Sequence, residues 1–87
     1  MLIGLDAIYL TLKKWQQEND NLVDLFDTSE AKYYIVYDVR NERFHVELTY
    51  SLITFNEVYF SDNEVAKRCI NDNLGVLNHL IDTSKNK

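Results

Sequence analysis

The sequence predicts a single α+β domain of the order αβββα, with an N-terminal helix, a three-stranded antiparallel β-meander and a C-terminal helix. Three observations predict this order. Apolar residues recur at helical spacing near the N-terminus, apolar and polar residues alternate along Arg43–Leu52, and Ser61–Glu64 has the pattern of a helix cap. The chain has 87 residues, two glycines and no proline, so we expect one core and short connections.

Residues 1–26 form the expected N-terminal helical segment. Their apolar positions follow each other at steps of three and four, which places them along one side of a helix. This pattern ends in the polar residues 17–21, and the apolar residues 22–26 are either a further turn of the core or an exposed patch. A loop over residues 27–31 is expected to lead into the sheet. The helical stripe comprises Leu2, Leu5, Ile8, Tyr9, Leu12 and Trp15.

Residues 32–60 form the predicted meander. Lys32–Val39 is rich in aromatic and β-branched residues, which favour a strand. A turn with Asn41 in the left-handed conformation is expected to connect it to the second strand, Arg43–Leu52. The third strand is expected to end at Phe60. Because the links are short, we expect strands that follow each other in sequence to be neighbours in the sheet.

The alternation along the second strand separates a face for the core from a face for solvent. The first strand is apolar on both faces, so its orientation stays open at this point. If Tyr33, Ile35 and Tyr37 face the helices, then Tyr34 and Val36 face water. The predicted core face of the second strand comprises Phe44, Val46, Leu48, Tyr50 and Leu52, and its predicted solvent face comprises His45, Glu47, Thr49 and Ser51.

Residues 61–81 form the expected C-terminal helical segment. Ser61 and Glu64 match a capping box, in which each side chain accepts a hydrogen bond from the backbone amide of the other residue. Gly75 is the expected helix stop, followed by a short helical turn and a frayed tail over residues 82–87. We expect both helices to cover one face of the sheet and the other face to stay exposed. The predicted buried stripe comprises Val65, Ala66, Cys69 and Ile70.

Composition and charge exclude several classes of function. A net charge of −5 argues against binding to nucleic-acid phosphates or to anionic lipid. No apolar run approaches the roughly 20 residues of a membrane-spanning helix. The single cysteine cannot form an internal disulfide, which favours a reducing compartment. We therefore expect a cytoplasmic protein that contacts neither a membrane nor nucleic acid directly.

The residues that could carry chemistry are too scattered to predict an active site. His45, His79 and Cys69 do not have the spacing of a metal site. Cys69 also lies in an apolar helical stripe, which suits a core residue better than a nucleophile. A domain of this size has little room for a concave catalytic site. We therefore predict that the protein is not an enzyme and holds no metal and no cofactor.

Two segments, AKYYIVYDV at residues 31–39 and VYFSDNEVAKRCIN at residues 58–71, resemble a module of small phage and prophage proteins of low-GC Gram-positive bacteria. In that module a strand similar to KYYIYYD precedes a turn, a second strand and a segment similar to IYFSSEELAEKAIE. The resemblance spans residues 31–80 and implies a phage-linked origin in a bacterial host cell, but no catalytic residue. The matching residues are Lys32, Tyr33, Tyr34, Ile35, Tyr37, Asp38, Val58, Tyr59, Phe60, Ser61, Glu64, Ala66 and Ile70.

A protein-binding module is the function that the sequence favours. Small phage accessory proteins often bind host proteins, so the resemblance implies an inhibitor or modulator, for example of a defence nuclease in the manner of an anti-CRISPR or anti-restriction protein. The exposed sheet face would present tyrosines and acidic side chains to a basic surface of that host protein. The residues predicted to bind the partner are Tyr34, Val36, His45, Glu47, Glu57 and Tyr59.

Three alternatives stay open. Tyr34 and Tyr59 could serve only cross-strand packing. The exposed face or an edge strand could pair with a second copy, giving a homodimer or a structural adaptor. Acidic residues elsewhere could imitate nucleic acid and occupy a basic groove. That mimic surface would comprise Glu18, Asp20, Asp24, Asp27 and Glu30.

Overall fold

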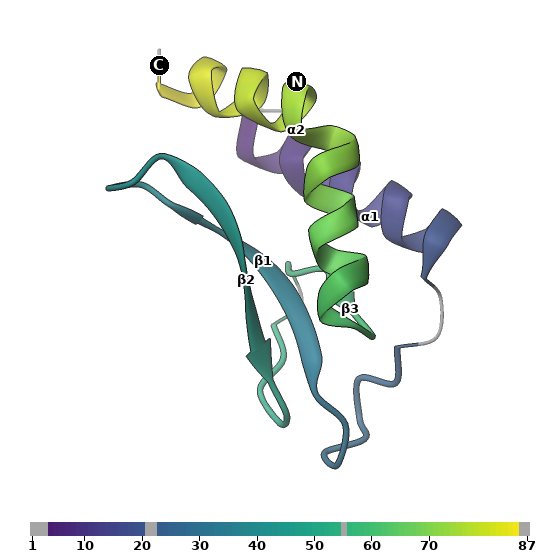
Figure 1. Ribbon diagram of the computed structural model, residues 1–87. Helices are drawn as coiled ribbons and strands as arrows, with labels where there is room; N and C mark the ends of the chain where they lie inside the picture. The colour runs from purple at the N-terminus through teal and green to yellow at the C-terminus, as the bar shows by residue number, and fades with distance from the viewer. Residues whose placement is uncertain (1–3, 21–22, 55, 86–87) are drawn as a thin grey trace.

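The computed structural model describes residues 4–20, 23–54 and 56–85, and it confirms the α+β class and the order of one helix, three strands and one helix (Figure 1). Leu2 and Leu22 lie outside the described residues. The elements are α1 (Gly4–Asn19), β1 (Lys32–Asp38), β2 (Arg43–Thr49), β3 (Tyr59–Phe60) and α2 (Asn63–Lys85).

The strands form one antiparallel sheet in the order β2-β1-β3. β1 pairs along its whole length with β2, from Lys32 opposite Thr49 to Asp38 opposite Arg43, and near its start it pairs with β3. The expected adjacency of the second and third strands is therefore wrong. β1 is apolar on both faces, so a central position in the sheet buries more of its apolar surface than an edge position would. The nine residues 50–58 are long enough to carry the chain from β2 to the far edge of β1.

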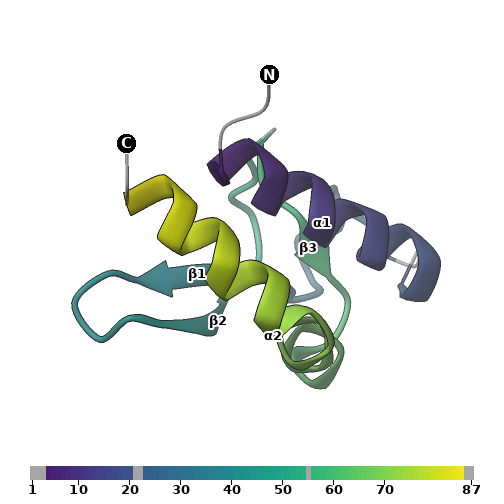
Figure 2. The same ribbon diagram turned by 90° about the horizontal axis from the view of Figure 1, so that it is seen from above.

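The helices cover one face of the sheet, as expected (Figures 1 and 2). α2 packs on all three strands, and α1 packs mainly beside α2. Tyr33 and Ile35 of β1 contact the core, so Tyr34 and Val36 face the opposite side, which settles the orientation left open by the sequence. The buried cluster comprises Leu12, Ile35, Val58, Phe60, Ala66, Cys69 and Leu77.

α1 buries only part of its predicted stripe. Leu12 is buried and the stripe residues around it pack against the core, whereas Leu5 is 59% exposed. The Trp15 indole nitrogen donates a hydrogen bond to Asp72 Oδ2 at 3.1 Å, which joins α1 to α2. The expectation that Leu5 is buried is wrong, because the first turns of α1 extend beyond the core.

The start of α2 is capped by Asp62 and not by Ser61. The Glu64 amide donates to Asp62 Oδ1 at 2.7 Å, as at a helix N-cap. The amide and hydroxyl of Ser61 donate to the two carboxylate oxygens of Asp20, each at 2.8 Å. The expected capping box is therefore wrong, because the charged Asp20 acceptor, placed there by tertiary packing, engages the Ser61 hydroxyl instead.

α2 continues through Gly75 to Lys85, so the helix stop expected at Gly75 and the frayed tail expected from residue 82 are wrong. Gly75 has no positive φ. A glycine in a helix interior costs roughly 0.5–1 kcal/mol relative to alanine. Leu77 and Ile81 lie beyond it and are buried. Burying such side chains contributes about 1.5–3 kcal/mol each, which outweighs the cost of the glycine.

The β1–β2 hairpin turns through residues 39–42, with a positive φ of 53° at Glu42 and not, as expected, at Asn41. The side-chain amide of Asn41 donates to Asp38 Oδ2 at 2.6 Å, and its backbone amide donates to Asp38 Oδ1 at 3.2 Å. These two hydrogen bonds lower the pKa of Asp38, and the one from the Asn41 side chain has the larger effect. The Lys85 ammonium lies 2.7 Å from Glu42 Oε1, which attaches the end of α2 to the hairpin.

Candidate functional site

The face of the sheet opposite α2 gathers most of the residues that the sequence predicts for partner binding. In the ladder between β1 and β2, Tyr34 lies opposite Glu47. One step further along the same face, Val36 lies opposite His45. On the other edge of β1, Tyr34 pairs with Tyr59 of β3. The structure therefore places these five residues on one face, and we call them, together with Glu57, the sheet-face residues.

Tyr59 does not have the exposure that the binding hypothesis assigns to it. Only 7% of the residue is exposed, and its hydroxyl accepts a hydrogen bond from the Thr54 amide at 2.9 Å. Its ring meets that of Tyr34 edge to face, with 5.8 Å between the centroids. The expectation of an exposed Tyr59 is wrong, because the chain from β2 to β3 must cross beside β1 and covers this ring. Tyr59 therefore packs against Tyr34 across the strands, and Tyr34 stays partly exposed.

A groove of 290 Å³ lies on this face, and we call it the sheet-face groove. β1 and β3 contribute one tyrosine each, and the end of β2 and the chain that leads to β3 contribute the other lining residues. It is lined by Tyr34, Leu48, Thr49, Leu52, Thr54, Glu57 and Tyr59.

Among the described residues that line the sheet-face groove, Glu57 is the single charged one. Burial raises the pKa of its carboxyl, and the hydrogen bond from the Val58 amide acts in the opposite direction. In the part of the chain that the structure describes, Glu57 takes part in none of the ion pairs. It is thus a half-buried carboxylate that forms no ion pair with a described residue.

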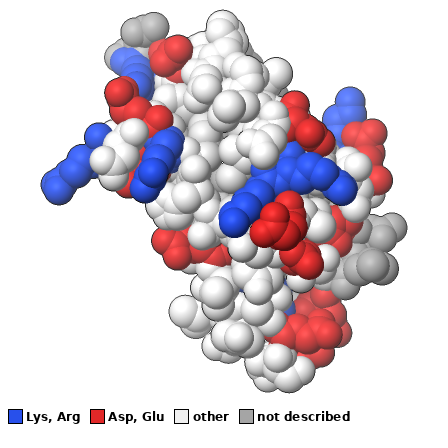
Figure 3. Space-filling view, in the orientation of Figure 1, with Lys and Arg blue, Asp and Glu red and all other residues white. Residues whose placement is uncertain are grey.

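Exposed apolar side chains gather at the end of the sheet where β1 begins and β2 ends. Phe26 is 83% exposed and Leu52 is 77% exposed, and Leu48 and Tyr50 are exposed as well. We call these four residues the apolar end. In Figure 3 the corresponding lower end of the molecule is largely uncharged, with acidic side chains beside it. Several exposed large apolar side chains at one end of a domain are typical of an interaction site.

The apolar end differs from the sequence-based expectation. Leu48, Tyr50 and Leu52 were expected to point into the core, and the expectation of their burial is wrong. Leu48 lies on the expected side of the sheet, opposite Tyr33, but it is exposed because the helices do not cover this end of β2. Tyr50 and Leu52 follow the end of β2 at Thr49, so the alternation of the strand no longer places them. Residues 23–26 are not helical, and the exposure of Phe26 settles the choice left open for that stretch in favour of an exposed patch.

Lys32 holds the two loops of the apolar end together. The residue is 1% exposed, and its ammonium donates hydrogen bonds to three backbone carbonyls. The acceptors are Asp27, Glu30 at 3.0 Å and Tyr50 at 2.8 Å. All three donors of the ammonium are thus satisfied, which makes its burial possible. The sequence analysis missed this role, although a lone cation at the start of an apolar strand could have indicated it.

The five acidic residues of the mimic hypothesis do not form one exposed surface. Asp20 is buried and bound to Ser61, so its assignment to that surface is wrong. Asp24 and Asp27 accept hydrogen bonds from backbone amides two residues ahead, at 3.0 and 2.9 Å, and so stabilise local turns. The side-chain hydrogen bond from Ser29 lowers the pKa of Asp27. Glu18, Asp24 and Glu30 are exposed, and Asp27 is partly exposed.

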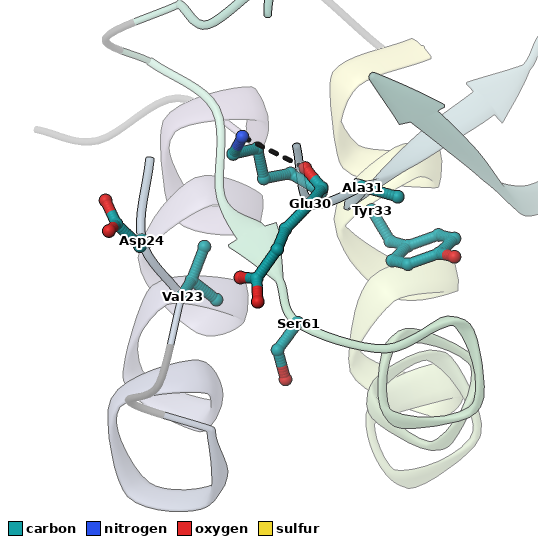
Figure 4. Close-up of a pocket in the computed structure, with 7 residues that line it drawn as sticks. Val23, Asp24, Glu30, Ala31, Tyr33 and Ser61 are labelled. Atoms are coloured by element: carbon teal, nitrogen blue, oxygen red, sulfur yellow. Dashed lines mark hydrogen bonds between the residues drawn. The ribbon is translucent and has the colours of Figure 1, made fainter. Parts of the chain in front are cut away.

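A cavity of 430 Å³ lies between the chain before β1 and Ser61, which precedes α2 (Figure 4). The Glu30 side chain points into it, toward Ser61, while the Glu30 carbonyl accepts the Lys32 hydrogen bond. None of its described lining residues is a histidine or cysteine, and the Ser61 hydroxyl donates its proton to Asp20.

Cys69 is fully buried, as expected for a core residue. Burial, the largest influence, raises the pKa of the thiol to about 12. A reactive cysteine needs the opposite, a lowered pKa and access to solvent. His45 lies on the sheet face with its Nε2 atom 3.0 Å from Glu47 Oε1, and His79 is exposed on α2. The described residues contain no group of three metal-ligating side chains.

Comparison with known protein families, with curated proteins and with solved structures gives no match for this chain. Among the described residues, neither helix has the length and apolar character needed to cross a membrane.

Proposed function

We propose that this chain is a non-catalytic, phage-linked module that binds a basic surface of a bacterial host protein and inhibits or modulates it. The apolar end carries the proposal. Phe26, Leu48, Tyr50 and Leu52 are exposed, and Leu48 and Leu52 also line the sheet-face groove, a distribution suited to a protein partner.

Charge supports a basic partner. The acids near the apolar end are Glu47, Glu57 and, in the loop before β1, Glu30, whereas the nearest cation of that loop region, Lys32, is buried. An acidic rim around apolar anchors favours a partner with lysine and arginine side chains around an apolar centre. Nucleic-acid-binding enzymes have such surfaces. The resemblance to phage proteins makes a host defence nuclease the target class that we propose.

Affinity capture from a lysate of a low-GC Gram-positive bacterium tests this proposal. We expect the wild-type chain to retain one protein that a Leu52→Asp or Tyr34→Ala chain does not retain. Leu74→Asp is the matched control, because Leu74 is also an exposed leucine but lies on α2, on the helix-covered side of the sheet. Capture that persists with Leu52→Asp excludes the apolar end as the interface. Failure of the wild-type chain to retain any protein removes the proposed function.

A second candidate function is self-association through β2. Among the described residues this strand pairs with β1 on one edge only, and a groove of 280 Å³ is lined by residues of β2 and α2. If two copies pair antiparallel about Val46, His45 of one copy lies opposite Glu47 of the second copy, so the edge is self-complementary in hydrogen-bonding side chains. A single monomeric species in sedimentation at 100 µM excludes this candidate. A dimer that His45→Glu weakens supports it.

A further inference from the structure

We propose that the sheet-face groove is a receptor site for one arginine or lysine side chain of the partner, with Glu57 as the residue that binds its charge. This inference rests on the proposed function and specifies its chemistry. The groove offers 290 Å³, near the lower limit of about 300 Å³ for small-molecule sites, so it suits one side chain better than an organic cofactor.

The lining of the groove matches both the aliphatic stem and the charged head of a basic side chain. Tyr34, Leu48 and Leu52 provide apolar surface on which the stem can pack, as the stems of lysine and arginine pack on apolar surface in other proteins. Tyr34 is partly exposed, and an aromatic ring beside a bound cation adds a favourable cation–π interaction. A purely apolar side chain would leave the Glu57 carboxylate more deeply buried without a partner, which is costly.

Two of the hydroxyl groups of the groove already accept hydrogen bonds within the domain. The Thr49 hydroxyl accepts the Leu52 amide at 3.1 Å, and the Tyr59 hydroxyl accepts the Thr54 amide at 2.9 Å. The Glu57 carboxylate therefore remains as the charged acceptor of the groove, and burial already raises its pKa. A cation that binds there relieves a charge that the isolated domain leaves half desolvated.

No cation of the described chain occupies this position. Lys13 and Glu57 both line a second cavity of 120 Å³, yet they form no ion pair. Glu47, the other acid of the sheet face, is already within 3.0 Å of His45 and does not line the groove. Glu57 and Glu47 therefore form a matched pair, because both are acids of the same face but only one belongs to the groove.

A titration of the full-length, ¹⁵N-labelled chain with Nα-acetyl-arginine methylamide tests the inference by NMR. We expect saturable shifts of the Tyr34, Thr54 and Glu57 amides, with a Kd of about 1–10 mM, as befits a single side chain. The citrulline analogue has nearly the same shape without the charge, and we expect no saturable shift with it. Glu57→Gln is expected to weaken arginine binding about tenfold or more, and Glu47→Gln less than twofold.

The Tm of the Glu57→Gln chain is the control for folding. Because burial disfavours the ionised carboxyl of Glu57, the neutral amide is expected to raise Tm. A loss of arginine binding by a chain with a raised Tm cannot be attributed to unfolding. Equal binding of arginine and citrulline derivatives, or unchanged binding by Glu57→Gln, overturns the inference. If arginine does not bind but Leu52→Asp still abolishes partner capture, the groove assignment fails and the proposed function stands. Capture unaffected by Leu52→Asp rejects the proposed function itself.

Discussion

Replacing Gly75 by alanine is expected to stabilise the protein. Gly75 lies in the interior of α2, has no positive φ, and a Cβ atom built on it meets no atom within 4 Å. Alanine therefore fits without strain, and it restricts the unfolded chain more than glycine does. A glycine that ended the helix in the left-handed conformation would give the opposite result, because alanine is strained there.

The expected gain follows from the helical position of Gly75. Glycine to alanine in a helix interior contributes about 0.5–1 kcal/mol to the free energy of unfolding. The unfolding entropy is about 2.1 cal/mol/K per residue, which for the 87 residues of this chain is about 0.18 kcal/mol/K. Dividing the gain by this entropy predicts an increase of about 3–5 °C in Tm.

Thermal unfolding followed by circular dichroism at 222 nm, together with urea titration, measures this effect. The Gly75→Asn chain is the matched control, because asparagine is a poorer helix former than alanine but tolerates the left-handed conformation better. We expect stability in the order alanine, asparagine, glycine. A lower Tm for Gly75→Ala than for the wild type, with Gly75→Asn unaffected, refutes the continuous helix.

Three further predictions concern buried polar and thiol groups. Lys32→Met should lower the free energy of unfolding by about 2–4 kcal/mol in urea titration, because three carbonyls lose their donor, whereas the exposed Lys67→Met should change it by less than about 0.5 kcal/mol. Asp20→Ala should cost about 1–3 kcal/mol by removing both acceptors of Ser61, and an unchanged urea midpoint contradicts that role. The Cys69 thiol should react with Ellman's reagent at pH 8 only in denaturant, and rapid reaction of the native protein contradicts its burial and raised pKa.

The candidate site was partly accessible from the sequence. The alternation along β2 predicted that His45 and Glu47 share a face, and the ladder confirms this placement with Tyr34 and Val36. The burial of Tyr59 could not be predicted, because it depends on where the chain after β2 crosses the sheet. The apolar end was missed for a related reason. A period of two gives the side of the sheet on which a residue lies, but not where a helix stops covering that side.

The sequence by itself determined the type and order of the elements, the core position of Cys69 and the two-faced pattern of β2. These properties follow from periodicity between residues a few positions apart, which any local stretch retains. The tertiary structure decided the central place of β1, the continuation of α2 through Gly75 and the burial of Lys32. Each of these depends on contacts between residues distant in the chain, such as the hydrogen bond from Lys32 to the Tyr50 carbonyl. Such contacts form only once the domain is assembled, and their free energy then exceeds the local conformational preference of the residues involved.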